Sequence, residues 1–260
     1  MGGEGFICLM YHELERPPRP LCQSDPGYVR YIMPEARFHE QICWLHSEGR
    51  HGLSVGEALA SSKSGSIVIT FDDGCESDLL FAAPILKEYE HHATFYVTAG
   101  FLGKPGYLSP PQLRELHALG FEIGCHSMTH AYLNDLSSQE LEVEVVDARS
   151  KLEDVLGSKV EHLSCPGGRW DERVLALARE AGYLSVANSR AHANSASTDR
   201  FRLGRVAIMR ETSQAAFKQI CNGDRLWKID LGDSLRGSAR RMLGNVLYDR
   251  VRDVMLRRSL

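Results

Sequence analysis

Two adjacent carboxylates, Asp72 and Asp73, are the first residues in this chain whose position suggests chemistry. They end the apolar run Ile67 to Phe71 and are followed by Gly74. The C-terminal ends of the strands form the catalytic rim of an α/β barrel, so carboxylates that end a buried strand indicate an active site. Asp-Asp-Gly is also common in turns, and the motif alone leaves catalysis and a turn equally open.

The second group is a pair of histidines, His126 and His130, directly after the strand predicted at Phe121 to Gly124. Imidazoles four residues apart can bind one ion when the backbone turns helically, because residues i and i+4 share a helix face. Together with Asp73 they would supply three nitrogen and oxygen ligands and leave a coordination position open for water. The sequence therefore predicts one divalent metal ion, zinc by default, although cobalt and nickel suit the same ligands.

The rest of the chain predicts repeated βα units around a parallel sheet. Short apolar runs alternate with segments of helical period, and most runs are apolar throughout, as strands buried on both faces are. Strands are expected to begin near Phe6, Ile67, Thr94, Phe121, His162, Leu184 and Arg205. Capping residues and closing glycines predict helices from Ser109 to Gly120, from Ser137 to Gly157 and from Asp171 to Gly182.

Two segments and the C-terminal end depart from this alternation. Residues Glu13 to Pro34 and Ala191 to Arg200 are expected to be surface loops. Residues 1–221 form one predicted barrel domain, and residues 222–260 form a basic helical tail. The tail either packs on the barrel or contacts an anionic membrane surface or a protein partner. Its arginines are Arg236, Arg240, Arg241, Arg250, Arg252, Arg257 and Arg258.

The composition argues against some classes of partner and compartment. A formal net charge of −4 and a pI near 6.3 give no overall attraction to nucleic acid, and none is expected as a partner. No signal peptide or membrane-spanning run is recognisable, so the chain is expected in the cytoplasm, or in the cell envelope if a leader precedes it. The seven scattered cysteines are expected to be reduced thiols.

The two motifs resemble the polysaccharide deacetylases, the NodB homology domain of carbohydrate esterase family 4. The resemblance rests on Thr-Phe-Asp-Asp-Gly at 70–74 and on His-Ser-Met-Thr-His at 126–130, and it runs from Phe6 to about Arg210. It implies a distorted (β/α)7 TIM-like barrel. It also implies that Asp72 is the catalytic base and that Asp73 binds the metal with the two histidines.

The family's third motif, usually Arg-x-Pro-Tyr/Phe-Gly, resembles residues 164–168 of this chain. Ser164 stands where the arginine that orients the base would be, and Gly167 replaces the aromatic residue. Pro166 and the Gly167 N–H are still expected to line the substrate and the oxyanion.

The arginine that orients the base must then come from another part of the chain. Arg205, at the start of the last predicted strand, resembles an arginine found in relatives that lack the one in motif three. Arg169 and Arg202 are the alternatives.

The family's late Leu-x-His motif, the source of the general acid, has no counterpart after Arg205. The first strand is instead followed by His12. This resembles a branch of poly-N-acetylglucosamine deacetylases whose final motif is permuted to the N-terminus, and it implies that His12 is the acid. A structural histidine that closes the strand is the other interpretation, with His162 and His192 as alternative acids.

Three cysteines, Cys75, Cys125 and Cys165, each neighbour a motif. A thiolate added to the Asp73 and histidine ligands would close the site to water. These cysteines are therefore expected to be small buried residues rather than ligands of that ion.

The predicted function is removal of N-acetyl groups from N-acetylglucosamine-containing glycans or their precursors by a metal-dependent hydrolase. In this hypothesis Asp72 takes a proton from a metal-activated water, and His12, kept protonated near neutral pH by a nearby carboxylate, protonates the departing nitrogen. One alternative is an O-acetyl esterase or small-molecule amidase with the same site. The other is a catalytically silent glycan-binding barrel, which the degraded third motif would allow.

Overall fold

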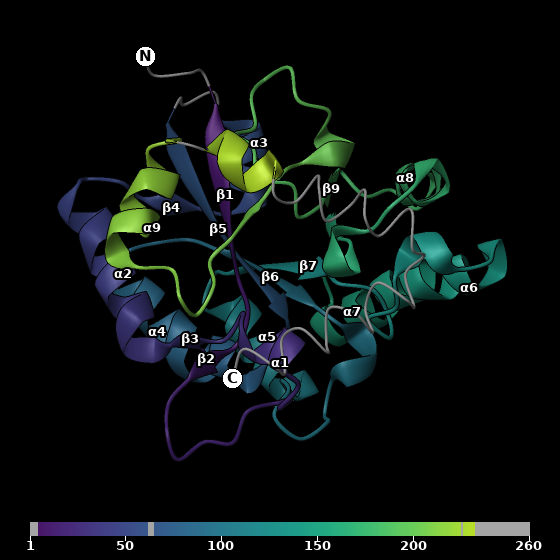
Figure 1. Ribbon diagram of the computed structural model, residues 1–260. Helices are drawn as coiled ribbons and strands as arrows, with labels where there is room; N and C mark the ends of the chain where they lie inside the picture. The colour runs from purple at the N-terminus through teal and green to yellow at the C-terminus, as the bar shows by residue number, and fades with distance from the viewer. Residues whose placement is uncertain (1–4, 62–64, 225, 232–260) are drawn as a thin grey trace.

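A curled sheet of parallel strands forms the centre of the protein (Figure 1). The computed structural model describes residues 5–61, 65–224 and 226–231. The strand order is β10-β1-β5-β6-β7-β8-β9. These strands are β1 (Phe6–Tyr11), β5 (Ser66–Asp73), β6 (Thr94–Val97), β7 (Glu122–Cys125), β8 (His162–Ser164), β9 (Ser185–Ala187) and β10 (Val206–Ala207).

Every strand on this path begins at its predicted residue or one residue away. A parallel bridge between Ala187 and Leu203 joins the end of β9 to the chain just before β10, so the two edges of the curled sheet approach each other. The predicted α/β barrel of seven parallel strands is confirmed. A short strand that the sequence did not predict, β4 (Gly52–Leu53), pairs with the first half of β5.

Helices surround the sheet, with α2 and α4 on one side and α6 and α8 on the other (Figure 1). The three predicted helices are present, and the one expected from Ser137 to Gly157 contains a π-helical segment between α6 and α7. Ser109 and Ser137 each form the expected capping box, and Gly157 ends α7 in the left-handed conformation. The α-helices are α1 (Pro26–Val29), α2 (Glu35–Ser47), α3 (Val55–Ala60), α4 (Ala83–Glu88), α5 (Pro110–Ala118), α6 (Ser138–Glu142), α7 (Ala148–Leu156), α8 (Glu172–Glu180) and α9 (Gln214–Cys221). The π segments are η1 (Asp78–Ala82) and η4 (Val143–Asp147), and the 3-10 turns are η2 (Ala99–Phe101), η3 (Leu133–Asp135), η5 (Pro166–Gly168) and η6 (Arg200–Arg202).

Aromatic rings on adjacent strands pack in series beneath the C-terminal ends of β1, β5 and β6. The Phe71 ring lies 5.3 Å from the Tyr11 ring and 5.0 Å from the Phe95 ring, both in stacked geometry. Phe38 of α2 meets Tyr11 and Phe71 edge-on. All four side chains are fully buried, so this packing fixes β1, β5 and β6 relative to α2 and supports the residues that follow.

The segment from Glu13 to Pro34 is not the surface loop that its polar composition predicts. It contains β2 (Leu14–Glu15) and β3 (Met33–Pro34), which pair in parallel, and α1 between them. Glu13 is fully buried, as are Leu14 and Met33. These few apolar residues anchor the segment on the barrel although the residues between them are polar.

The second predicted loop, Ala191 to Arg200, is only partly exposed. Asn194 is fully buried, and its backbone exchanges two hydrogen bonds of 2.8 Å with Phe6. Its side chain bonds the backbone of Gly204. The loop therefore holds the start of β1.

The basic tail lies mostly outside the described residues. Its arginines from Arg236 onward are not among them, so both interpretations of the tail stay predictions. Residues 226–231 are helical, and Leu226 is buried. Within the described part of the chain, no helix combines the length and the apolarity that crossing a membrane requires.

A buried polar network lies at the opposite end of the strands from the rim. Glu122, His162 and Ser185 are the first residues of β7, β8 and β9. The His162 ring nitrogens lie 2.9 Å from the Ser185 Oγ and 3.5 Å from the Glu122 carboxylate. Glu122 also accepts hydrogen bonds from the Thr94 hydroxyl at 2.5 Å and the Gly56 N–H at 3.0 Å. His162, an alternative acid, is therefore far from the carboxylates of β5.

We expect Glu122→Ala to lower the free energy of unfolding by about 2 kcal/mol, because the Thr94 and Gly56 donors lose their acceptor in a buried place. Urea unfolding measures the change. The matched control is Glu115→Ala on the exposed face of α5, expected to change stability by less than about 0.5 kcal/mol. Equal effects of the two substitutions would contradict a stabilising role for the network.

Candidate active site

The sequence-predicted metal ligands meet at the C-terminal ends of β5 and β7. Asp73 is the last residue of β5, and His126 directly follows β7. One potential ligand atom from each of Asp73, His126 and His130 lies within 4.8 Å of the others. His126 and Asp73 are buried, and His130 is partly exposed.

The two histidines do not meet through a helical turn, as their spacing suggested. Residues 126–130 form no helix, and Ser127 and His130 have left-handed φ values of 67° and 66°. The buried Glu144 of η4 holds this turn by accepting hydrogen bonds from the N–H groups of Met128 and Thr129, both at 2.9 Å. A left-handed turn, rather than one face of a helix, brings the imidazoles together.

The geometry around Asp73 fits a divalent cation. The Nε2 atoms of His126 and His130 lie 3.6 and 3.4 Å from the Asp73 Oδ1. That oxygen is buried, and no hydrogen-bond partner for it exists among the described residues. The His126 Nδ1–H donates to the Ser164 carbonyl at 2.9 Å, which leaves the Nε2 lone pair directed away from that carbonyl. Burial lowers the pKa of His126 to about 4, so the ring is neutral, as a metal ligand must be.

The other carboxylate, Asp72, forms a buried ion pair with Arg205. Two guanidinium nitrogens of Arg205 lie 2.6 and 2.8 Å from the two Asp72 oxygens. Arg205 also donates to the Ser164 Oγ at 2.6 Å and to the Asn188 carbonyl at 3.1 Å. Burial works to raise the pKa of Asp72, but Arg205 and His126 hold it below its usual range.

The alternative arginines have different surroundings. Arg202 pairs with Glu172 at 2.7 Å on the surface. Arg169 is buried with its guanidinium 3.4 Å from the centre of the Tyr132 ring. Arg205 is thus the candidate with an observed bidentate contact to the Asp72 carboxylate.

His12 follows β1, which pairs in register with β5 up to Tyr11 and Phe71, so His12 comes next to Asp72. Its electrostatic neighbours are Asp73, Asp72, Arg205 and His130. The buried Nδ1 has no hydrogen-bond partner among the described residues. Burial outweighs the two carboxylates and lowers the pKa of His12, so the ring is not held protonated near neutral pH as the sequence suggested.

The remaining alternative acid, His192, lies in the loop before β10. Its ring packs on Gly204, and its electrostatic neighbours are Asp230 and Arg190. These surroundings are separate from the Asp72 and Asp73 carboxylates.

The third motif forms the turn η5 at the end of β8. Gly167 is exposed and has a left-handed φ of 60°, and Pro166 before it is buried. A Cβ at Gly167 would lie 2.8 Å from the Tyr132 ring, so that ring occupies space next to the glycine. Tyr132 supplies an aromatic face where motif three lacks one. Tyr132 was not among the predicted site residues, although its position two residues after His130 could have pointed to it.

The cysteines that neighbour the motifs differ in their surroundings. Cys125 and Cys165 belong to the apolar core, and burial raises their thiol pKa to about 11 and about 12. All seven cysteines are free. Cys75 has polar neighbours, which are described below.

Known proteins share both the sequence pattern and the fold. The polysaccharide deacetylase family matches residues 60–186. The Bacillus subtilis (strain 168) protein YxkH is 29% identical over 215 residues, which cover 80% of this chain and 73% of YxkH. The poly-beta-1,6-N-acetyl-D-glucosamine N-deacetylase of Staphylococcus aureus (strain MRSA252) is 27% identical over 178 residues. That match covers 61% of each protein, so the chain spans about three fifths of this relative.

Among solved structures, the Streptococcus pyogenes deacetylase PplD in complex with acetate superposes with a TM-score of 0.74. The superposition covers 84% of this chain and 98% of that one, at 24% identity, and it shows a shared fold. The sequence match runs through the strands that carry Asp72, Asp73 and the two histidines. The chain is therefore similar to the polysaccharide deacetylase family in sequence over residues 60–186, and it shares the fold of deacetylases of known structure.

Proposed function

We propose that this protein is a metal-dependent hydrolase that removes N-acetyl groups from N-acetylglucosamine-containing glycans or their precursors. The observation that carries the proposal is the cluster of Asp73, His126 and His130 beside the Asp72 carboxylate. Relatives named as carbohydrate deacetylases support the reaction class.

The ligand set fits a divalent cation held by Asp73, His126 and His130, with zinc as the default and cobalt or nickel as alternatives. When bound, such a cation supplies Lewis acidity to a water and to the acetyl carbonyl. The Ser164 carbonyl and Glu144 fix the histidines in place before any ligand arrives.

Asp72 accepts the proton of the attacking water in this proposal. Arg205 binds both carboxylate oxygens and keeps Asp72 ionised at neutral pH, so the carboxylate can act as a base without first losing a proton. The Gly167 N–H, on the exposed turn after Ser164, donates to the developing oxyanion, and Pro166 fixes that turn.

His12 protonates the departing nitrogen. It lies on the other side of Asp72 from β6, because β5 is paired with β1 on one edge and β6 on the other. Because its lowered pKa leaves the ring neutral at neutral pH, His12 has to receive a proton first, and the proton that Asp72 takes from the water is the source.

The metal-loaded protein is expected to release acetate from chitooligosaccharides faster than from acetylated xylan. Asp73→Ala or His126→Ala should remove one equivalent of divalent ion and the activity together, since each deletes a ligand. Asp72→Asn should keep the ion and lose most turnover. Metal analysis and an acetate assay measure both quantities.

The Asp72→Asn variant is the matched control, because it changes the neighbouring carboxylate without removing a ligand. Loss of the ion in Asp72→Asn, with retention in Asp73→Asn, would reverse the two assignments. Faster release from acetylated xylan would instead assign the protein to the O-acetyl esterases.

His12→Ala is expected to slow amide hydrolysis by roughly 10²–10⁴-fold, the usual contribution of general acid catalysis. An activated acetyl ester should be affected much less, because its leaving group needs no proton. Rates on the two substrates, with metal content and circular dichroism as controls, test this assignment. Equal losses on amide and ester would exclude His12 as the acid.

Arg205→Lys is expected to lower kcat by roughly ten- to a hundredfold, while KM and metal content stay close to wild type. Lysine keeps the charge but cannot bind both oxygens of Asp72 in the bidentate geometry. Arg202→Lys, on the surface, is the matched control and should change neither constant. A rise in KM with an unchanged kcat would show that Arg205 does not position the base.

A further inference from the structure

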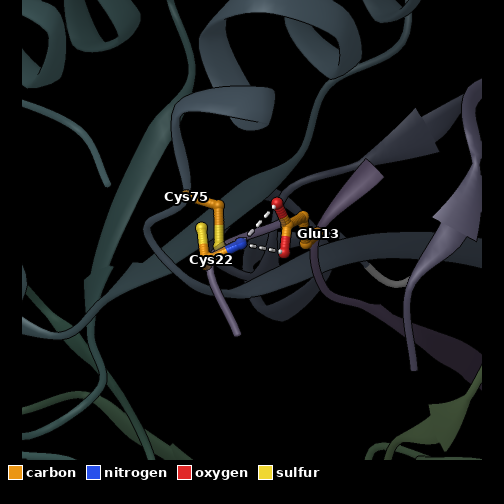
Figure 2. Close-up of side chains that lie close together, drawn as sticks. All are labelled: Glu13, Cys22 and Cys75. Carbon is orange, nitrogen blue, oxygen red and sulfur yellow. Dashed lines mark hydrogen bonds between the residues drawn. The ribbon is translucent and has the colours of Figure 1, made fainter. Parts of the chain in front are cut away.

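A second group of metal-binding side chains lies next to the candidate active site. Glu13, Cys22 and Cys75 each place a potential ligand atom within 4.8 Å of the others (Figure 2). Glu13 directly follows His12, and Cys75 follows Gly74 in the first motif. Glu13 and Cys75 are fully buried and Cys22 is partly exposed, so the group is enclosed but accessible from one side.

Hydrogen-bond donors surround the three side chains. Arg19 pairs with the Glu13 carboxylate and lies 3.6 Å from the Cys22 sulfur. The Tyr28 hydroxyl lies 3.3 Å from both a Glu13 oxygen and the Cys75 sulfur. Donors to the carboxylate and to the sulfur atoms are what the outer shell of a thiolate metal site provides, because they orient the ligands and spread their charge.

The charges of the group balance when a dication is added. The Cys22 thiol donates a hydrogen bond to the Gly106 carbonyl at 3.0 Å, and Arg19 pairs with the negative charge of Glu13. A dication that displaces the two thiol protons adds two positive charges and removes two, so the charge of the buried group stays balanced. Near it lies Asp78, fully buried, whose two carboxylate oxygens have no hydrogen-bond partner among the described residues.

The surroundings of Cys22 and Cys75 distinguish them from the other cysteines. Cys125, Cys165 and Cys221 are buried in the apolar core, where a thiol acts as a small hydrophobic residue. Cys22 and Cys75 instead share a carboxylate, a guanidinium and a hydroxyl as neighbours. Thiolate ligands select borderline and soft cations, of which Zn²⁺ is the common divalent case.

We propose that Glu13, Cys22 and Cys75 bind a second divalent cation of the zinc type, distinct from the ion proposed at Asp73. The cation connects Glu13, which follows β1 and His12, to Cys75, which follows β5. It therefore holds the ends of β1 and β5 together. This second site shares no ligand with the proposed active site. Its test therefore does not depend on whether the proposed function is correct.

The test is a titration of the metal-free, full-length protein with Co²⁺ in the presence of a non-thiol reductant. We expect two equivalents to bind, one of them with the near-ultraviolet absorption of cobalt–thiolate bonds. Cys22→Ser and Cys75→Ser should each remove that absorption and one equivalent. His126→Ala should remove the other equivalent and leave the absorption intact.

Cys43→Ser, at the exposed cysteine, is the matched control and should leave both equivalents. If the serine variants fold poorly, Glu13→Gln provides the second test, with the absorption kept and the affinity for Co²⁺ lowered at least tenfold. Thiolate absorption that survives in the Cys22→Ser/Cys75→Ser double variant would overturn the proposal. So would a single equivalent that His126→Ala abolishes, or a Cys22–Cys75 disulfide found by thiol counting in protein that binds no second ion.

Discussion

The buried ion pair between Asp72 and Arg205 is the interaction on which the candidate active site depends. Arg205 is the largest fully buried side chain among the described residues, and it contacts Thr70, Ser164 and Asn188 besides Asp72. It therefore joins the ends of β5, β8 and β9 from its place before β10. A buried pair is tolerable only when each charge is fully hydrogen-bonded, so the strand ends have to close around this guanidinium.

The two adjacent carboxylates are separated by backbone geometry as well as by their partners. Neighbouring residues of a regular strand point to opposite faces, which would send Asp72 and Asp73 apart. Asp73 has a φ of 116°, and this irregularity lets its carboxylate approach His126 while Asp72 stays paired with Arg205. Such strain in a non-glycine residue is stored mainly at functional sites, where the surrounding structure enforces it.

Much of the fold could be predicted from the sequence, because the strands are apolar throughout and capping residues mark the helices. The turn from Ser127 to His130 could not, since its left-handed residues depend on Glu144, far along the chain. The segment from Glu13 to Pro34 was misjudged because its few anchoring residues, such as Leu14, are isolated among polar ones. Local patterns report on continuous burial, and they miss contacts that single residues make across the fold.

The same limit explains why the choice among three arginines needed the structure. Parallel strand ends meet on one rim, so a functional group can come from any strand beside the position it serves. Arg205 reaches Asp72 past β1. The small side chain of Ser164 leaves room for the Arg205 guanidinium and accepts a hydrogen bond from it. His12, which follows β1, lies near enough to both carboxylates for their charges to act on its ring. The altered third motif is thus compatible with a complete site, because what the proposed chemistry requires is a guanidinium at Asp72 and not an arginine at position 164.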